Sequence, residues 1–333
     1  MMTEQTRLLE NWQRVLALSA LQPDENVVIL DGWDRPRRYK IVAALACEQM
    51  GASVLYVEVP DPNRLPGSLV PLLEKADLII DLVFVHDSRI HAVRETGTRV
   101  LLVLEPPEIL DRLVPTPADK AAALHAVERI RGARQMHVTS QAGTDLRFDI
   151  GQYRVNCQYG YADTPGRWDQ WPGAFVSTFA NDGSGDGRVV FDRGDMMFPF
   201  HRYFNDRVEL EIESGWIRHI AGGYEADLLR SYLDRYESPD VYALSHLGWG
   251  LSRNARWEAL GQYPPNTIEG QDGRAFAGNF LFSTGPNASG GGNRKTACHV
   301  DMPMRNCTVR LDGTPVVIDG KLVEQVPPAP VPA

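Results

Sequence analysis

The feature that most constrains the fold is an alternation of two kinds of segment in the first 135 residues. Amphipathic stretches such as 37–51 and 87–97 each end on a glycine, which commonly terminates a helix. Between them lie short apolar runs rich in β-branched residues, at 27–31, 53–59, 77–85 and 99–105. Continuous apolar strands that alternate with helices predict a parallel sheet covered on both faces, and therefore an α/β domain.

From about residue 136 the pattern changes to alternating polar and apolar residues, broken by Gly-Asp and Asp-Gly turns. One helix is expected at 224–236, and the proline-rich end of the chain is expected to be a loose tail. The predicted organisation has three parts: an α/β domain at 1–135, a mainly antiparallel α+β domain at 136–323, and the tail at 324–333. A further helix is expected from Thr116, because Pro117 and Asp119 suit its first turn and a capping box.

Composition excludes several classes of partner. The 333 residues carry a formal net charge of -9, with no basic stripe, which argues against nucleic acid. No uncharged apolar run approaches the roughly 20 residues that a membrane span needs, and the first residues lack a signal-peptide core. We therefore expect a cytoplasmic protein without a membrane partner. The four cysteines lie far apart and suggest neither a disulfide framework nor a zinc ribbon.

Two glycine-containing segments resemble nucleotide-binding motifs without meeting their requirements. The first apolar run is followed by LDGWDRPRR, which lacks the G-x-G-x-x-G of dinucleotide-binding folds. In the segment 285–296, Lys295 is preceded by Arg294 where a phosphate-binding loop needs glycine. This segment is therefore interpreted either as a lid over a site or as a plain surface loop.

His299 and Asp301 form the most suggestive chemical pattern, an H-x-D pair. In an extended segment, residues two apart point to the same side, so this pair can bind one metal ion from one face. A second histidine would complete the 2-His-1-carboxylate set that holds non-heme iron. His246 is a candidate, although a buried structural histidine explains its sequence context equally well. The pair alone is weak evidence, because two such residues often meet by chance.

The segment 160–175 concentrates aromatic and polar side chains between turn formers, including Trp168. We expect it to be irregular, and irregular aromatic segments often form pocket walls for flat ligands. The alternative is a small aromatic core held by an ion pair between Arg167 and Asp169.

Four strings carry a resemblance to a known family: YGYADTPGRWDQWP, SHLGWGLSRNARW, GNFLFSTGPN and RKTACHVDMPMRNC. They closely resemble the 2,5-dihydroxypyridine 5,6-dioxygenases, the ring-opening enzymes of bacterial nicotinate breakdown, which are distantly related to aminopeptidase T-like metallopeptidases. The resemblance extends through nearly the whole chain. It implies an Fe(II)-dependent ring-cleaving dioxygenase that opens 2,5-dihydroxypyridine between C5 and C6, with O2, to N-formylmaleamate.

The resemblance also implies roles for individual residues. The iron ligands of the family fall on His246, His299 and Asp301, and its proton-accepting histidine falls on His86. A substrate-contacting arginine of the family falls on Arg274. Pocket-lining roles are expected for Trp168, Gln158 and Gln170, the last two replacing an acid and a histidine of the family.

Three alternatives remain open from the sequence. The same chemistry could act on another hydroxylated N-heterocycle or a phenol, which the glutamines at 158 and 170 favour. A metallopeptidase would need a second metal with further ligands, for which carboxylates such as Glu225 are available. A non-catalytic binding module is the third. We also expect a homo-oligomer with a small aromatic substrate and O2 as its other partners.

Overall fold

The computed structural model describes residues 4–32, 37–198, 200–264 and 267–323, which form two compact units. Both units are discontinuous in sequence. The first comprises Met1–Leu124, Cys157–Phe175 and Asn254–Asp272, and the second comprises His125–Asn156, Val176–Arg253 and Gly273–Ala333. The sequence predicted a single boundary near residue 135, whereas the chain passes between the units several times. The predicted tail lies outside the described residues.

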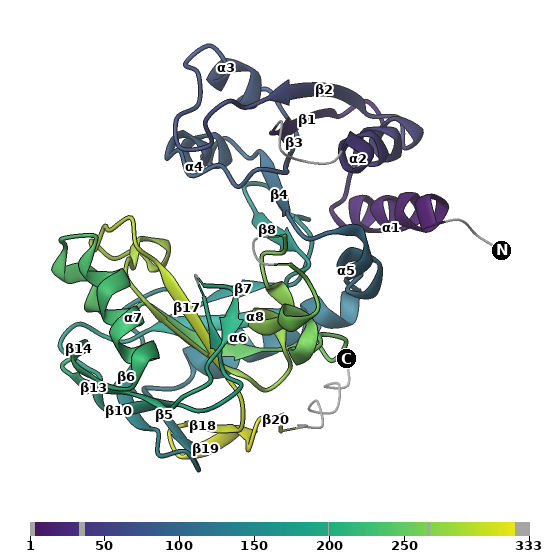
Figure 1. Ribbon diagram of the computed structural model, residues 1–333. Coiled ribbons are helices and arrows are strands. Elements are labelled where there is room, and N and C mark those ends of the chain that lie inside the picture. The colour runs from purple at the N-terminus through teal and green to yellow at the C-terminus, as the bar shows by residue number, and fades with distance from the viewer. Residues whose placement is uncertain (1–3, 33–36, 199, 265–266, 324–333) are drawn as a thin grey trace. The chain divides into compact units, whose positions relative to one another are not determined.

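The first unit is built on a parallel sheet with strand order β2-β1-β3-β4-β8 (Figure 1). The apolar runs of the sequence form the first four strands and the amphipathic stretches form helices, as predicted. Its elements are α1 (Glu4–Leu18), β1 (Asn26–Asp31), α2 (Arg37–Gln49), β2 (Ser53–Glu58), α3 (Val70–Leu73), β3 (Leu78–Asp81), α4 (Arg89–Glu95), β4 (Arg99–Val103), α5 (Pro107–Arg112), β8 (Trp168–Trp171) and η2 (Trp257–Gly261).

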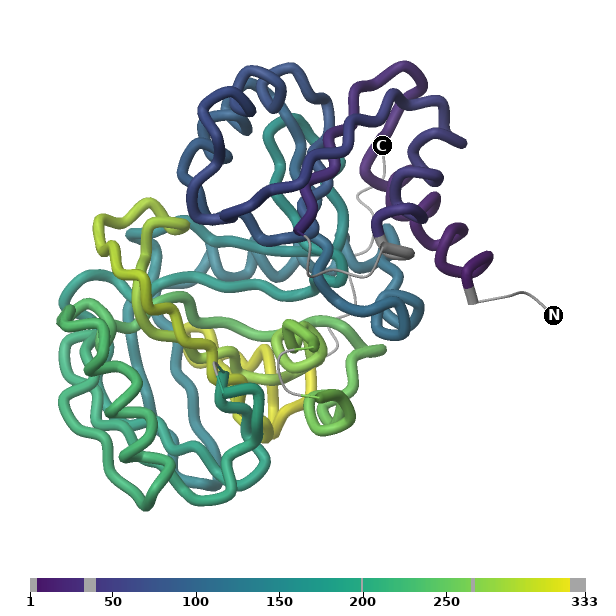
Figure 2. Tube along the Cα trace, turned by 45° about the horizontal axis from the view of Figure 1, so that its top comes forward, coloured from purple at the N-terminus to yellow at the C-terminus, as the bar shows by residue number. Residues whose placement is uncertain are grey.

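Strand β8 corrects the expectation that the segment 160–175 is irregular throughout. Trp168 pairs with Val100 and Trp171 with Val103, so the segment joins the sheet as its fifth strand. Figure 2 shows this teal segment running among the blue strands of the first unit. The turn-forming residues on both sides of β8 indicated an irregular segment, although the four-residue strand between them is buried from its second residue onward. The local pattern was too short to identify a strand whose partner lies 68 residues away along the chain.

Strand β3 ends at Asp81, four residues before the end of the apolar run that predicted it. The buried carboxylate of Asp81 accepts the backbone N–H groups of Val83 and Val85, at 3.0 and 2.8 Å. Phe84 adopts a positive φ of 59° within this turn. A side chain that bonds to the backbone two to four residues ahead competes with strand pairing. The turn therefore stops the strand and leads into the exposed residue His86.

The second unit is mainly antiparallel, as predicted. It contains an eight-stranded sheet of order β14-β13-β10-β6-β5-β18-β19-β20, a β11-β12 pair, and a sheet in which β17, β16, β15 and β9 are neighbours. The elements are β5 (Gln135–Ser140), β6 (Asp145–Asp149), β9 (Phe175–Phe179), β10 (Asp186–Phe191), β11 (Met196–Met197), β12 (Arg202–Tyr203), β13 (Val208–Glu213), β14 (Trp216–Gly222), α7 (Tyr224–Asp234), η1 (Pro239–Tyr242), β15 (His246–Gly250), β16 (Phe280–Thr284), η3 (Ala288–Gly290), β17 (Val300–Met304), β18 (Cys307–Leu311), β19 (Thr314–Ile318) and β20 (Lys321–Leu322).

Three further elements, α6 (Pro117–Arg131), β7 (Asn156–Gln158) and α8 (Gln271–Ala275), lie where the chain passes between the units, as does the first residue of β9. The capping box predicted for α6 is present, since the Asp119 carboxylate accepts the N–H of Thr116 at 2.7 Å and the Thr116 hydroxyl accepts the N–H of Asp119 at 3.4 Å. None of the helices among the described residues has the length and apolarity that crossing a membrane would require.

Candidate metal centre

The register of the sheet in the second unit explains how His246 and Asp301 come together. Gly248 of β15 pairs with Leu281 of β16, which places His246 beside Ser283. On the other side of β16, Ser283 pairs directly with Asp301 of β17. Two residues that flank the same position of a central strand project to the same face of a sheet. Three adjacent strands therefore bring His246 next to Asp301, although the two residues are far apart in the sequence.

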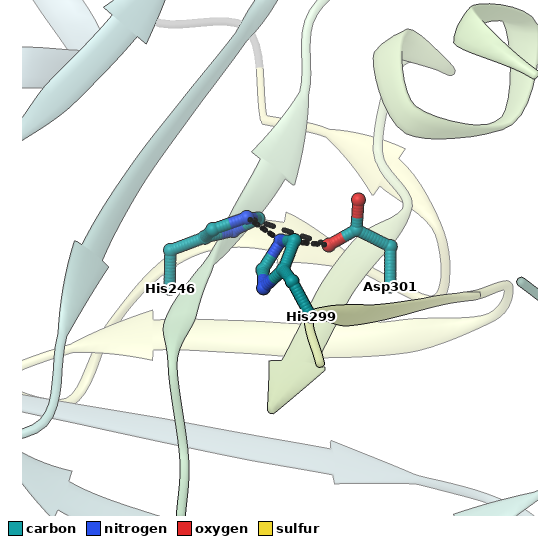
Figure 3. A group of neighbouring side chains, drawn as sticks. All are labelled: His246, His299 and Asp301. Atoms are coloured by element: carbon teal, nitrogen blue, oxygen red, sulfur yellow. Dashed lines mark hydrogen bonds and ion pairs between the residues drawn. The ribbon is translucent and has the colours of Figure 1, made fainter. Parts of the chain in front are cut away.

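His299 lies two residues before Asp301 and joins the same group (Figure 3). The Nε2 atoms of the two histidines are 3.0 Å apart, and Oδ1 of Asp301 lies 3.4 Å from Nε2 of His246 and 3.2 Å from Nε2 of His299. Two donor atoms each about 2.1 Å from one ion lie about 3.0 Å apart at a right angle and about 3.4 Å apart at a tetrahedral angle. The spacing therefore fits three ligands of a single ion.

Hydrogen bonds around the group select the atoms that can bind metal. Nδ1 of His299 lies 3.1 Å from the carbonyl oxygen of Thr284, and a donor Nδ1–H there leaves the Nε2 lone pair for an ion. The Ser283 hydroxyl donates to the carbonyl of His246 at 2.6 Å, and the Phe179 ring packs edge-on against the His246 ring. Thr284 and Ser283 were not predicted, because nothing in a single sequence marks a residue whose role is to orient another.

Electrostatics prepare the group for a cation. Burial lowers the pKa of His246 to about 4, so its imidazole is neutral at pH 7. Burial would raise the pKa of Asp301, but the neighbouring His299 and Arg274 outweigh it and hold that pKa well below its usual value. Burial also opposes protonation of His299, whereas the Asp301 charge raises the pKa of this histidine. The ionised carboxylate and the neutral His246 are donors that a divalent metal requires, and a metal that binds His299 would displace the proton that Asp301 favours there.

Arg274 contacts the carboxylate rather than lying apart from it. Its Nε donates to Oδ2 of Asp301 at 2.6 Å, while Oδ1 faces the two histidines. The guanidinium lies 4.4 Å from the centre of the Phe198 ring, a favourable cation–π arrangement. The N–H of Phe198 donates to the Asp301 carbonyl at 3.2 Å. Arg274 and Phe198 together orient the carboxylate so that one oxygen points toward the histidines.

The remaining predicted residues belong to the first unit. His86 follows β3 at the carboxyl end of the parallel sheet, where α/β proteins commonly place functional side chains, and its ring lies 4.3 Å from that of Phe84. Gln170 of β8 is buried beside Leu102, and Gln158 ends β7. Trp168 is half-buried and packs against the apolar core of the first unit. The roles assigned to these residues stay predictions.

Asp169, beside Gln170, forms the ion pair that the sequence offered as an alternative to a pocket wall. Arg167 lies 2.5 Å from the Asp169 carboxylate, and its guanidinium stacks 3.6 Å from the centre of the Tyr159 ring. The same carboxylate accepts the backbone N–H groups of Tyr159 and Gly160. This part of the segment is therefore a packed aromatic cluster.

A second metal has no evident ligands among the described residues, where His246, His299 and Asp301 make up the one group of this kind. Glu225, the carboxylate considered for a second ion, is buried and accepts the backbone N–H groups of Asn205 and Asp206. Cys298, which precedes His299, is also buried, and burial raises the pKa of its thiol to about 11, so this side chain packs as a neutral thiol.

Segment 285–296 is tied to its surroundings by hydrogen bonds. Oδ1 of Asn287 accepts the N–H of Arg294 at 2.8 Å, and the Arg294 guanidinium donates to the carbonyl of Leu244 at 2.6 Å. A side chain at Gly290 would collide with the Phe179 ring, which accounts for glycine there. Whether this segment moves as a lid stays a prediction.

Fold and site together define a class: a two-unit protein with a parallel α/β sheet in one unit and a 2-His-1-carboxylate cluster suited to one metal ion in the other. A family model described as NicX, 2,5-dihydroxypyridine 5,6-dioxygenase, matches residues 7–324. The 2,5-dihydroxypyridine 5,6-dioxygenase of Pseudomonas putida is 42% identical over 336 residues, covering 95% of this chain and 96% of that protein. The chain belongs to this family of dioxygenases, which are oxidoreductases.

Solved structures agree with this assignment. The structure of 2,5-dihydroxypyridine dioxygenase from Pseudomonas putida KT2440 matches with a TM-score of 0.92 and 40% identity, covering 98% of this chain and 99% of that one. Wild-type AmpT from Thermus thermophilus matches with a TM-score of 0.66 at 14% identity, covering 97% of this chain. The second likeness shows a shared fold and nothing about activity. The predicted family and fold class are thereby confirmed, and the fold is also similar to that of AmpT.

Proposed function

We propose that this protein is an Fe(II)-dependent dioxygenase that opens the ring of 2,5-dihydroxypyridine between C5 and C6 to give N-formylmaleamate. The observation that carries the proposal is the cluster of His246, His299 and Asp301, in a chain 42% identical to an enzyme with this name. The reaction balances without another reductant, since both atoms of one O2 enter the product. The cytoplasmic location and the homo-oligomer remain predictions of the sequence.

Iron is proposed because of the reaction class, since the ligand spacing alone suits several divalent metals. Two imidazoles and one carboxylate leave coordination positions open, and this arrangement is typical of non-heme Fe(II) oxygenases. When bound, ferrous iron would supply Lewis acidity toward the ring 5-hydroxyl and a path for electrons from the ring to O2. His246, His299 and Asp301 would hold it, and Arg274 would keep Asp301 in a single orientation.

His86 is proposed as the base that accepts the proton of the 5-hydroxyl. It is exposed at the carboxyl end of the parallel sheet, on a turn that Asp81 holds with two backbone hydrogen bonds. Histidine is suited to this task because its ordinary pKa lies near neutrality. Removal of this proton makes the ring more electron-rich, which favours its oxidation.

Gln158 and Gln170 are proposed to contact the N1–C2 edge of the ring. Oε1 of Gln158 and Nε2 of Gln170 are both buried and have no hydrogen-bond partner within the described parts of the chain. A buried amide acceptor and a buried amide donor are costly unless a ligand or water satisfies them. The lactam form of a 2-hydroxypyridine offers an N–H donor beside a carbonyl acceptor, which complements this pair. Trp168 is a further proposed contact, supported by its place on the same strand as Gln170.

The test is oxygen consumption by protein purified anaerobically and supplied with ferrous iron. With 2,5-dihydroxypyridine, we expect one O2 consumed per ring, and with 18O2 we expect both labelled atoms in the product. No oxygen uptake with this substrate, but uptake with another hydroxylated ring, would keep the reaction class and reject the substrate. Hydrolysis of aminoacyl substrates without oxygen uptake would favour the metallopeptidase alternative.

N-methylation of the substrate tests the proposed contact of Gln158. It removes the N–H that Gln158 would bind, so we expect the KM to rise about tenfold for the wild type. A Gln158→Met variant should already show the higher KM and should respond little to methylation. Equal sensitivity of the wild type and the variant would reject this contact.

A further inference from the structure

The two glutamines proposed to contact the ring lie on strands that are not paired with each other. Gln158 ends β7 and Gln170 belongs to β8, and these strands are not neighbours in any sheet of the described residues. The two residues nevertheless come close, because a Cβ atom at Gly173 would lie 2.9 Å from Oε1 of Gln158 and 2.4 Å from the carbonyl oxygen of Gln170. Contacts other than sheet pairing must therefore hold the two backbones in place.

The carboxylate of Asp169 connects the two backbones. It is fully buried, and its Oδ1 accepts the N–H of Gln170 at 2.8 Å. The same oxygen accepts the N–H groups of Tyr159 and Gly160, the two residues that follow Gln158, at 3.2 and 3.0 Å. Burial raises the pKa of Asp169 to about 6, so the group is still mostly ionised at pH 7. Hydrogen bonds to a charged acceptor are stronger than neutral ones, so this oxygen holds both segments firmly.

Arg167 completes the arrangement on the other side of Gln158. Its guanidinium donates to Oδ2 of Asp169 through Nε, at 3.0 Å, and through Nη2. Nη2 also donates to the carbonyl of Cys157 at 3.2 Å. The ring of Tyr159, whose centre lies 3.6 Å from the guanidinium, keeps the arginine in this position. Gln158 is therefore fixed through the residue before it and the residue after it.

We propose that Asp169 and Arg167 are positioning residues that set the placement of the Gln158 and Gln170 amides, and with it the preference for a ring that carries an N–H beside a carbonyl. This proposal rests on the proposed function, since it assumes that the two amides bind the N1–C2 edge. Neither Asp169 nor Arg167 would touch the substrate. Both act through the backbone on either side of Gln158 and through the N–H of Gln170.

The two amides need such placement because their bonding atoms are buried. Oε1 of Gln158 and Nε2 of Gln170 have no hydrogen-bond partner within the described parts of the chain, so a ring that bonds to both gains two hydrogen bonds at once. Hydrogen bonds weaken steeply when the distance or angle departs from its preferred value. A rigid ring presents its donor and acceptor at a fixed spacing, so both bonds form only if the two amides are held at the matching spacing.

The test compares 2,5-dihydroxypyridine with its N-methyl derivative in oxygen-uptake assays. Asp169→Asn keeps an oxygen for the backbone N–H groups but loses the charge that holds Arg167. For the wild type we expect a KM about tenfold higher with the derivative, and for Asp169→Asn a ratio of the two KM values close to one. This change should come from a KM for 2,5-dihydroxypyridine that rises about tenfold, while kcat changes by less than about twofold. A merely structural role would lower the amount of active protein, and therefore the apparent kcat, without changing this ratio.

Arg167→Lys provides a second variant in case the first one fails to fold. Lysine keeps a positive charge but lacks the planar group that bonds the carboxylate and the Cys157 carbonyl together, so we expect a KM ratio of about three. Arg112→Lys is the matched control. Arg112 also joins a buried carboxylate, that of Asp272, to a backbone carbonyl, that of Asn254, and the side chains of both arginines are 18% exposed. The KM ratio of this control should stay at the wild-type value.

The outcomes separate this proposal from the proposed function. A wild-type KM ratio in Asp169→Asn and Arg167→Lys, or an equal fall of the ratio in Arg112→Lys, would overturn the positioning role and leave the reaction standing. A wild type that oxidises both rings with the same KM would also overturn it, because no contact with the N–H would exist to be positioned. A wild type that consumes no oxygen with either ring would reject the proposed function, and this proposal with it.

Discussion

Two buried carboxylates, one in each unit, show how the surroundings decide what a buried acid can do. Glu105 of the first unit is fully buried and accepts the backbone N–H groups of Gln271 and Glu269, and burial raises its pKa to about 7. Asp301 of the second unit is also buried, yet the adjacent His299 and Arg274 keep its pKa well below the usual value. Burial alone favours the neutral acid, and neighbouring cations reverse that preference. Asp301 alone of these two is prepared to bind a metal at neutral pH.

The two units also differ in how they position functional side chains. In the second unit, sheet register places His246 and Asp301 on either side of Ser283, so three strands hold the cluster rigidly. In the first unit, His86 lies on a turn beyond the end of β3. Residues within a sheet are positioned more accurately than residues on connecting turns. We therefore expect activity to be more sensitive to a small displacement of a proposed metal ligand than to a similar displacement of His86.

The largest expected effect is that of removing the charge of the proposed metal ligand Asp301. If this change had no effect, the contrast drawn between Asp301 and Glu105 would be wrong. Asp301→Asn keeps the shape of the side chain but removes the charge that favours a divalent ion. We expect ferrous iron to be lost on gel filtration and turnover to fall at least about 1,000-fold. Iron content and oxygen uptake measure the two effects. Asp145→Asn, at a carboxylate whose side chain is 58% exposed, is the control, and retention of iron and full activity by Asp301→Asn would refute the ligand assignment.

His86→Ala should have the next largest effect, and it separates the chemistry of the first unit from metal binding. Loss of a general base typically lowers the rate about 100- to 10,000-fold. We expect kcat to fall and its pH dependence to change, while iron content stays at the wild-type level. His91→Ala, at an exposed histidine of α4, should behave like the wild type. A wild-type rate and pH profile for His86→Ala would remove this residue as the base.

The elements of the fold were predictable where one segment carries its own pattern. The apolar runs of β1 and β2 and the capping box of α6 are local signals, and each was predicted correctly. Strand β8 was not predicted, because its identity as a strand depends on β4, which is distant in sequence. The discontinuous units escaped prediction for the same reason: a boundary depends on contacts rather than on composition.

The same distinction, between local sequence patterns and contacts of distant segments, applies to the residues of the site. His299 and Asp301 are visible as H-x-D because residues two apart in an extended segment share a face. The selection of His246 needed the family resemblance, since the register of β15 against β16 is a property of the folded sheet. The bond between Arg274 and Asp301 could not be predicted at all, because α8 and β17 show no pattern that relates them. The resemblance implied a substrate contact for Arg274 and did not suggest this bond.

Glu105→Gln tests whether burial without a compensating charge raises the pKa of Glu105, in contrast to Asp301. The pKa of Glu105 is raised from 4.5 to about 7 in the folded protein, so its contribution to stability is fully present below pH 4.5 and is lost as pH rises through 7. This change corresponds to about 3 kcal/mol of the free energy of unfolding. Glutamine cannot ionise, so the variant should lose less stability between pH 5 and pH 8. Urea unfolding at several pH values measures this, and parallel pH curves for wild type and variant would contradict it.

The smallest expected effect comes from Arg274, and it decides whether this residue acts on the carboxylate or on the ring. Partners that orient a metal ligand typically contribute about 10- to 100-fold to metal affinity. Arg274→Gln should therefore weaken binding of ferrous iron by this factor, measured by anaerobic calorimetry without substrate. Arg274→Lys keeps a positive charge but loses the planar guanidinium that bonds Asp301 and stacks on Phe198, so it should restore affinity only in part.

Arg147→Gln, at an arginine whose side chain is 61% exposed, controls for the general loss of a positive charge. If Arg274→Gln binds iron as tightly as the wild type but has a higher KM, the arginine acts on the substrate and the orienting role is wrong. Weaker iron binding with an unchanged KM at saturating iron assigns it to the carboxylate instead. Because the first measurement contains no substrate, the two roles cannot be confused. In the latter case, Arg274 acts on the site through Asp301, whose pKa it helps His299 to hold well below the usual value.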